Sequence, residues 1–479
     1  MNKKLYVNGV WIPAKEGKTF PVYNPATKEV IAHVADAGES DVQKAIQAAS
    51  DAFPLWSRKT ALERAELLRD VYDKMVAIKE ELAYLMTLEQ GKTLQEARGE
   101  IQYAADFIRW YSEEASRVYG KTIPASQTDK RIMVKKEPVG VVAAITPWNF
   151  PAAMITRKIG PALAVGCTAI VKPAAETPLT AIRIIELFVE AGVPKGVINL
   201  VTSTQSRKVG DVFLTDPRVR KVTFTGSTPV GKEIMQKAST TMKNLSLELG
   251  GHAPSIILED ADLEDTVNQV LQNKFRNAGQ TCISTNRIYV HEKIAGDFIQ
   301  LFTKKVAHLK VGNGLDAGVD IGPVIHENAV QKIEQQIKDA VEKGALITTG
   351  GNRHAQDSYF FQPTVLIDVN DDMLIQQEET FGPVVPIQTF SSDQEAIQKA
   401  NGSPFGLAAY VYTNHIGRAT RLIEGLEYGI VGLNDGLPST AQAPFGGYKE
   451  SGLGREGGQE GLEAYLETKY VSLRSPNFL

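Results

Sequence analysis

The chain has 479 residues, of which 43% are hydrophobic and 23% are charged, so it is long enough for two or three ordered domains with large cores. Its net charge is −4 and its Lys and Arg residues are spread along the sequence, which argues against a nucleic-acid partner. There is no run of about 20 apolar residues and no secretion signal at the start, so we expect a cytoplasmic protein without a membrane partner.

Helical spacing of apolar residues fills the region from 40 to 117, as in TALERAELLRDVYDKMVAI and LQEARGEIQYAADFIRWYSEEASR. Between residues 139 and 249 the pattern changes to short β-branched runs that are separated by helix-like stretches. The runs are VGVVAAIT, CTAIVK, GVINLV, RKVTFTG and KNLSLEL. This alternation predicts a mostly parallel sheet with helices on both faces, an architecture whose strand ends commonly bind nucleotides.

A second α/β domain is predicted from Pro254 onward. SIILEDAD, TNRIYV and ALITTG have the composition of strands, whereas DTVNQVLQNKFRNA and AVQKIEQQIKDAVEKG have helical spacing. Two further segments, RIMVKKEP before the first sheet and YLETKYVSLR near the C-terminus, are typical of lone strands. Exposed strands of this kind often pair between subunits.

Two glycine-rich motifs could bind phosphate. GLGREG (452–457) matches the dinucleotide pattern GxGxxG, but no strand leads into it and residues 458–479 are too few to complete a βαβ unit, so we interpret it as a turn or loop. GSTPVGKE (226–233) follows a predicted strand and opens a helix, where backbone N–H groups can meet an anion. It nearly matches a P-loop, yet Glu233 stands where a hydroxyl would bind magnesium. A P-loop phosphotransferase is therefore an alternative of a different class, and a plain turn is another.

The two cysteines have different surroundings. Cys167 lies in the apolar stretch ALAVGCTAIVK and is expected to be buried, whereas Cys282 lies among small polar residues in NAGQTCISTN. Such a pair does not indicate a disulfide framework. Cys282 is either a loop residue without a role or a group with thiol chemistry.

A series of ordered motifs resembles the aldehyde dehydrogenase superfamily. They are TPWNFP (146–151), VKP (171–173), FTGST (224–228), LELGG (247–251), GQTC (279–282) and EETFGP (378–383), followed by PFGGYKESGLGREGG near the C-terminus. Within the superfamily, MITRK, KFRNAGQTC and EYGIVGLNDG look most like succinate-semialdehyde dehydrogenases. The resemblance implies oxidation of an aldehyde with NADP or NAD.

The resemblance also implies an α/β fold with two doubly wound, Rossmann-like domains and a small β element for oligomerisation. Residues 1–120 and 140–250 would form the cofactor-binding domain, 251–432 the catalytic domain, and 121–139 with 460–479 the oligomerisation strands. Residues 433–459 would return to the cofactor-binding domain. A homo-oligomer is expected, most readily a tetramer, with a dimer as the alternative.

Three residues match the family's catalytic positions. Cys282 would be the nucleophile, because a thiolate converts an aldehyde into a tetrahedral adduct that can release hydride. Asn149, with the Cys282 backbone N–H, would stabilise the oxyanion, and Glu248 would activate water to hydrolyse the thioester. Superfamily members that transfer the acyl group to coenzyme A tend to lack this glutamate, so its presence favours a free acid as the product.

The family's cofactor positions fall on eleven residues of this chain: Thr146, Pro147, Trp148, Lys172, Ala175, Gly226, Ser227, Gly231, Leu249, Glu379 and Phe381. Lys172 would reach the adenosine ribose, and Glu379 and Phe381 would hold the nicotinamide ribose and ring. Members that prefer NAD commonly have a glutamate three residues after this lysine, whereas this chain has Ala175 there and Glu176 one position later. NADP is therefore slightly favoured over NAD.

Arg157, Arg276 and Ser439 match positions that hold the substrate's distal carboxylate in succinate-semialdehyde dehydrogenases. The alternative is a structural ion pair. Small anionic aldehydes are the expected substrates, with succinate semialdehyde preferred and sulfolactaldehyde, glutarate semialdehyde and lactaldehyde as alternatives. Many relatives have a second cysteine two residues after the nucleophile, but Ser284 stands there, so no disulfide can form at that place. No metal site is indicated.

Overall fold

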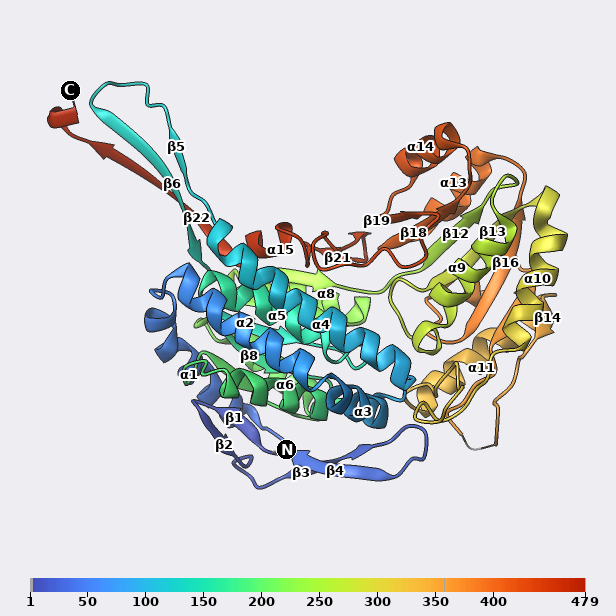
Figure 1. The fold of residues 1–479 in the computed structure, drawn as a ribbon, viewed down its shortest axis with the longest axis horizontal. Coiled ribbons are helices and arrows are strands. Elements are labelled where there is room, and N and C mark those ends of the chain that lie inside the picture. Colours follow the sequence, from blue (N-terminus) through green and yellow to red (C-terminus); the bar gives the residue numbers. More distant parts are fainter. Residues whose placement is uncertain (1–2, 357, 479) are drawn as a thin grey trace.

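The computed structural model describes residues 3–356 and 358–478. Two α/β halves, each built on its own sheet, lie side by side, and a long β arm projects from one of them (Figure 1). The predicted α/β class is confirmed, and both halves contain the expected parallel strands. Within the described residues, no helix has both the length and the apolar character needed to cross a membrane.

The first half contains an eight-stranded sheet in the order β2-β1-β9-β8-β7-β10-β11-β21. Its parallel centre consists of β7 (Val141–Ile145), β8 (Thr168–Lys172), β9 (Ile198–Leu200), β10 (Val219–Thr225) and β11 (Asn244–Glu248). Antiparallel strands complete its edges: β1 (Leu5–Val7), β2 (Val10–Ile12) and β21 (Gly452–Leu453).

Helices cover both faces of this sheet because its buried strands are apolar on both sides. On β7, Val142 and Ala144 pack with one group of helices, whereas Val141 and Ala143 pack with the other. The first group is α2 (Ala61–Ala77), α3 (Lys79–Gln90), α4 (Leu94–Glu114), α5 (Ala153–Val165) and α6 (Pro178–Glu190). The second group is α1 (Glu39–Trp56), α7 (Ser206–Thr215) and α8 (Thr228–Ala238). The helical region predicted from 40 to 117 is thus confirmed as α1 to α4.

The second half contains a seven-stranded sheet in the order β14-β15-β16-β13-β12-β18-β19. The strands are β12 (Ala253–Ile257), β13 (Thr285–His291), β14 (Leu346–Thr349), β15 (Thr364–Ile367), β16 (Val384–Phe390), β18 (Ala408–Tyr412) and β19 (Ile430–Leu433), and only β14 runs antiparallel to its neighbour. One face is covered by α9 (Leu263–Phe275), α10 (Ala295–Ala307) and α11 (Glu327–Glu342), the other by α13 (Asp393–Asn401) and α14 (Ile416–Gly425).

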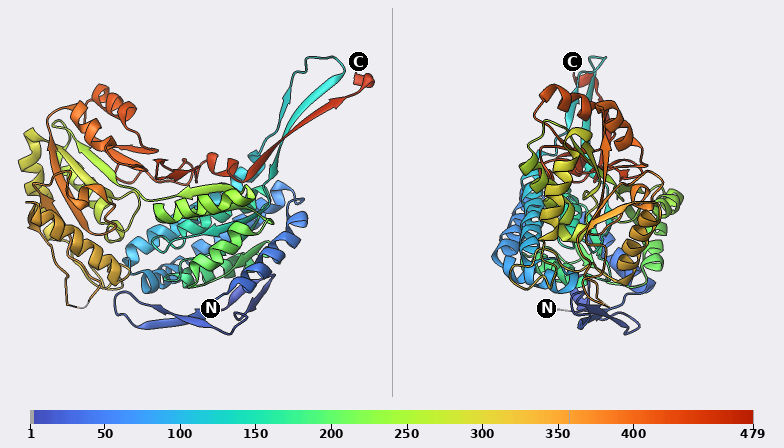
Figure 2. Two further views of the ribbon diagram at one scale, coloured as in Figure 1. Left: turned by 180° about the vertical axis from the view of Figure 1, so that it is seen from behind. Right: turned by 90° about the vertical axis from the view of Figure 1, so that its right-hand side faces the viewer.

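The projecting arm consists of β5 (Lys121–Ile123), β6 (Lys130–Pro138) and β22 (Leu466–Arg474), as Figures 1 and 2 show. The strands predicted as lone ones are β6 and β22, and that part of the prediction is wrong because they pair with each other along their whole length. Their far ends remain exposed; Tyr470 is 64% accessible.

Some strands were not predicted from the sequence, and several further elements are short. The sequence pattern does not predict the N-terminal strands, which include the hairpin of β3 (Thr19–Tyr23) and β4 (Val30–Ala35). The remaining elements are β17 (Phe405–Gly406), β20 (Tyr448–Lys449), α12 (Leu374–Gln377), α15 (Glu460–Glu463), η1 (Ala115–Arg117), η2 (Ser239–Thr241), η3 (Arg276–Gly279), η4 (Glu292–Ile294) and η5 (Pro476–Phe478). GLGREG, predicted as a turn or loop, is a loop except that its first two residues form β21, which pairs with β11.

Candidate active site

The loop that carries Cys282 has a constrained backbone. It follows α9, and three successive residues, Asn277, Ala278 and Gly279, have left-handed φ angles of 53°, 55° and 74°. Such angles are unfavourable for residues with a Cβ atom and persist where surrounding contacts enforce them. One such contact is a hydrogen bond of 2.6 Å from the Asn277 N–H to the Glu96 carboxylate. The loop is thereby fixed against α4.

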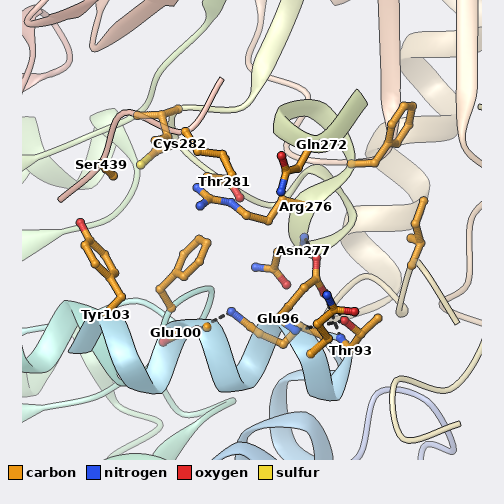
Figure 3. A pocket seen from close by; sticks show the side chains of 18 of the residues that line it. Thr93, Glu96, Glu100, Tyr103, Gln272, Arg276, Asn277, Thr281, Cys282 and Ser439 are labelled. Atoms are coloured by element: carbon orange, nitrogen blue, oxygen red, sulfur yellow. Dashed lines mark hydrogen bonds and ion pairs between the residues drawn. The ribbon is translucent and has the colours of Figure 1, made fainter. Parts of the chain in front are cut away.

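Cys282 borders a cavity of about 580 Å³ whose walls come from α4 and α5 of the first half and α9 of the second (Figure 3). Burial raises the pKa of the Cys282 thiol to about 12; Glu379 and Glu248 add to this effect, and Arg157 opposes it. The thiol is therefore protonated near neutral pH and needs a proton acceptor before it can act as a nucleophile.

Glu248, the last residue of β11, is positioned to be that acceptor. Its side chain is buried, and neither carboxylate oxygen receives a hydrogen bond from the described residues. Burial, with repulsion from Glu456, raises the pKa of Glu248 well above its usual value. A carboxylate in this state takes up a proton more readily than an ordinary glutamate does.

Glu456 lies in the loop that the GLGREG motif forms. Its carboxylate accepts hydrogen bonds from Arg157 Nε and from Lys158 Nζ, both on α5, and a bond of 3.3 Å from the Thr223 hydroxyl. These partners hold the pKa of Glu456 below its usual value although burial alone would raise it. The motif that resembles a dinucleotide loop thus supplies a buried anion for α5.

Asn149 lies in the turn after β7, next to the cysteine loop. Its side-chain amide donates to the Gln280 carbonyl at 3.1 Å, and its Oδ1 has no partner among the described residues. Because Gln280 is two residues before Cys282, this amide is adjacent to the backbone that leads to the thiol. The structure therefore brings Asn149 next to the Cys282 loop, and Glu248 is near enough to the thiol for its charge to raise the Cys282 pKa.

The residues expected to bind the substrate line the same cavity as Cys282. Arg157 pairs with Glu456, yet its Nη2 has no hydrogen-bond partner among the described residues. Arg276 has no ion pair within the described part of the chain and lies 5.3 Å from the centre of the Phe150 ring. Figure 3 shows its guanidinium group directed toward the space that Ser439 also borders. This end of the cavity therefore has cationic donors that are not saturated.

The comparison with known proteins agrees with this geometry. The model of the aldehyde dehydrogenase family matches residues 11–471. The chain belongs to the aldehyde dehydrogenase family. A mitochondrial succinate-semialdehyde dehydrogenase of Arabidopsis thaliana is 53% identical over 98% of this chain and 89% of its own length. A glutarate-semialdehyde dehydrogenase of Pseudomonas aeruginosa is 50% identical over 98% of this chain and 97% of its own length. The crystal structure of an Escherichia coli NADP-dependent enzyme has a TM-score of 0.98 at 49% identity and covers 99% of this chain and 98% of its own.

Enzymes of the family use NAD or NADP, and the residues at the expected cofactor positions fit such a molecule. Lys172 Nζ is held 3.0 Å from the Ser206 hydroxyl, Thr146 Oγ1 is buried without a partner among the described residues, and exposed Ser227 stands at the N-terminus of α8. These groups are donors for phosphate and ribose oxygens. Ala175 is half-buried, and Glu176 beside it is exposed.

The residues expected to hold the nicotinamide ribose and ring are also fixed by contacts within the protein. Glu379 accepts a hydrogen bond of 3.1 Å from the Gly251 N–H, and Phe381 meets Trp148 edge to face at 5.6 Å. Pro147 is half-buried beside Trp148. The remaining positions are shaped by packing: Gly226 lies against Phe224, and a Cβ atom at Gly231 would be 2.4 Å from the Leu249 side chain.

Four residues around the cavity were not identified from the sequence. They are Lys92, Glu100, Tyr103 and Glu456. Glu100 and Tyr103 are three residues apart on α4, as is expected of side chains that share one helix face, so helical periodicity could have placed them together. Glu456 contacts Arg157 across 299 residues of sequence, and no local pattern indicates such a pair.

Proposed function

We propose that the protein oxidises a small anionic aldehyde to its acid, with succinate semialdehyde as the preferred substrate and NADP or NAD as the hydride acceptor. The observation that carries the substrate assignment is the pair of arginines on the cavity of Cys282. Among the described residues, Arg276 has no ion pair and Arg157 Nη2 has no hydrogen-bond partner. Arg157 Nη2 and Arg276 Nε are buried without an acceptor among the described residues, which is unfavourable unless a ligand such as an anion meets them. The relatives named for succinate and glutarate semialdehydes support the same substrate class.

In the first half-reaction the Cys282 sulfur attacks the aldehyde carbon, and the thiol proton passes to a carboxylate such as Glu248. The Asn149 amide and the Cys282 N–H donate to the oxygen that becomes negatively charged. The nicotinamide ring, when bound, accepts the hydride that leaves the tetrahedral carbon. Cys282 is then left as a thioester.

Before the second half-reaction Glu248 passes the thiol proton to solvent. It then removes a proton from a water molecule, which attacks the thioester, and it returns that proton to the departing sulfur, so that the acid and the Cys282 thiol are released. The raised pKa of Glu248 suits this role because the carboxylate is a stronger base than that of an ordinary glutamate. Transfer of the acyl group to coenzyme A is the alternative outcome, and Glu248 favours water.

The substrate assignment is tested by comparing succinate semialdehyde with butyraldehyde, which has the same carbon number but no anion. We expect kcat/KM to favour succinate semialdehyde by at least about tenfold, because each charged hydrogen bond contributes roughly 1.5 to 3 kcal/mol. In Arg276→Ala the preference should shrink through a loss that is confined to the anionic aldehyde.

Arg109→Ala is the matched control, since it removes an exposed cation from the outer face of α4. This control should retain the preference. Equal efficiency of the two aldehydes in the unchanged protein would contradict the anion site while leaving the chemistry of Cys282 intact.

For the cofactor, we propose that NADP is used at least as well as NAD. Ala175 provides no carboxylate to repel a 2′-phosphate, and Lys172 with Ser206 offers donors to it. The Escherichia coli structure described as NADP-dependent supports this preference. Ala175→Glu should lower kcat/KM for NADP more than for NAD, whereas a preference for NAD of about tenfold or more in the unchanged protein would contradict the proposal.

We further propose that residues 1–120, 140–250 and 433–459 form the cofactor-binding domain, that residues 251–432 form the catalytic domain, and that residues 121–139 with 460–479 join subunits of a homotetramer. The division follows the two sheets, because β21 joins the sheet of the first half. Exposed apolar side chains on the arm, such as Tyr470, Leu473 and Ile123, support its role in assembly.

A further inference from the structure

The segment from Gln90 to Glu100 lies against both parts of the chain that carry the oxyanion donors. It contains a fully buried ion pair, Lys92 with Glu100, whose side chains are each 1% exposed. Both residues line the cavity, and Figure 3 shows Glu100 at its base, on the side away from Cys282. Neither residue belongs to the motifs from which the family was identified.

The two members of the pair fasten opposite ends of the turn that bears Asn149. Lys92 Nζ donates to the Asn149 carbonyl oxygen at 2.8 Å and lies 4.0 Å from the centre of the Phe150 ring. The second oxygen of Glu100 accepts hydrogen bonds from the N–H groups of Ala152, at 2.9 Å, and Ala153, at 3.3 Å. The turn between β7 and α5 is therefore held by one bonded pair of charges.

The same segment also holds the cysteine loop. The Gln90 amide donates to Asn277 Oδ1 at 2.9 Å, and the Asn277 amide donates to the Asn149 carbonyl oxygen, also at 2.9 Å. The Glu96 carboxylate accepts the Asn277 N–H. Lys92 and Asn277 thus meet on one carbonyl oxygen, so the spacing between the Asn149 turn and the Cys282 loop depends on both.

A buried ion pair is a weak source of stability, because apolar residues of similar size often serve equally well. What an apolar pair cannot do is donate to a backbone carbonyl and accept from two N–H groups. We propose that Lys92 and Glu100 are positioning residues that hold the Asn149 amide at the distance from the Cys282 N–H that the oxyanion requires. This inference rests on the role proposed above for Asn149.

The experiment is a double-mutant cycle on the full-length enzyme with saturating NADP and aldehyde. The measured quantity is the single-turnover rate at which reduced cofactor forms. Lys92→Met should lower this rate by at least about 20-fold, as expected when an oxyanion donor is displaced. In an Asn149→Ala background, the same change should lower it by less than about threefold, because the donor that Lys92 positions is already absent.

Glu100→Gln and the double variant Lys92→Met/Glu100→Gln provide the same test if the first variant does not fold, since the double variant leaves no buried charge unpaired. The matched control is Lys221→Met, which removes another buried lysine, one bonded to Asn244 and Ser246. Its effect, whatever its size, should multiply with that of Asn149→Ala.

The outcomes separate the inference from the proposed function. If Asn149→Ala keeps the wild-type rate, the oxyanion role of Asn149 is wrong. If Asn149→Ala is slow but Lys92→Met lowers the rate by the same factor in both backgrounds, only the positioning role is overturned. A loss confined to succinate semialdehyde and absent with butyraldehyde would also overturn it, because that pattern indicates a substrate contact.

Discussion

Two neighbouring regions of the first half each bury one carboxylate, and their environments are opposite. Glu456, in the loop after β21, is bonded to Arg157, Lys158 and Thr223, and its pKa is lowered. Glu248, at the end of β11, is equally buried at 2% exposure, has no hydrogen-bond partner among the described residues, and has a raised pKa. The comparison teaches that burial alone does not define a catalytic carboxylate; the presence or absence of donors decides whether it is structural or ready to accept a proton.

The strongest test of this difference is Glu248→Gln. We expect steady-state turnover to fall by at least about a thousandfold while a first burst of reduced cofactor remains but forms more slowly. Solvent can take the thiol proton in place of Glu248 during thioester formation, whereas hydrolysis of the thioester requires Glu248 to activate water. Stopped-flow absorbance of the reduced cofactor measures both phases.

Cys282→Ala is the control for the burst and should abolish it. Turnover of Glu248→Gln at the wild-type rate would show that Glu248 is not the base. The different environments of Glu248 and Glu456 would then not distinguish a catalytic carboxylate from a structural one.

The main expected effect of Glu456→Gln is a lower free energy of unfolding. The change leaves Arg157 and Lys158 buried without a full counter-charge, and breaking such a group typically costs about 3 to 5 kcal/mol. Glu248→Gln should change the free energy of unfolding by less than about 1 kcal/mol, because it removes a carboxylate that has no hydrogen-bond partner among the described residues. Denaturant unfolding of the two variants gives both values, and similar losses in both would remove the distinction.

The pH dependence of this stability has a defined sign. Because the folded pKa of Glu456 lies below its unfolded value of about 4.3, its contribution is present above that pH and is lost as the pH falls through the folded pKa. The Glu456→Gln variant should lack this part of the acid sensitivity.

The smallest expected effect concerns the Cys282 thiol. With a pKa of about 12, Cys282 in the cofactor-free enzyme should react with iodoacetamide at a rate that rises with pH and reaches no plateau below about pH 10. In Arg157→Ala the rate should fall, because a cation that stabilises the thiolate is removed. A plateau near neutral pH would indicate a thiolate that is already formed and would contradict the need for a proton acceptor.

The sequence predicts most of the fold, and the reasons are local. β-branched runs mark β7 to β13, and helical spacing marks α1 to α4, because these elements have periodic apolar patterns. The pairing of β6 with β22 was missed because it depends on a partner far along the chain. The strands β1 to β4 and, in the second half, β15, β16, β18 and β19 were also missed.

The residues of the candidate site also fall into two groups: those that local motifs predict and those that depend on a distant partner. Cys282 and Asn149 stand in motifs that can be read from neighbouring residues, and the structure places them together. Arg157 matches a substrate position and also forms the alternative ion pair, with a carboxylate from a motif interpreted as a plain loop. Its two roles could not be separated without coordinates, because its partner lies 299 residues further along the chain.

That separation has a consequence for how the protein is made. Arg157 and Lys158 emerge from the ribosome long before Glu456, which follows only after the second half has been synthesised and the chain has returned to β11. Until then, the interior of the first half holds two cations without their carboxylate and cannot reach its final packing. The N-terminal half is therefore dependent on the C-terminal residues for its last folding step, and a prematurely terminated chain contains Cys282 but no finished catalytic centre.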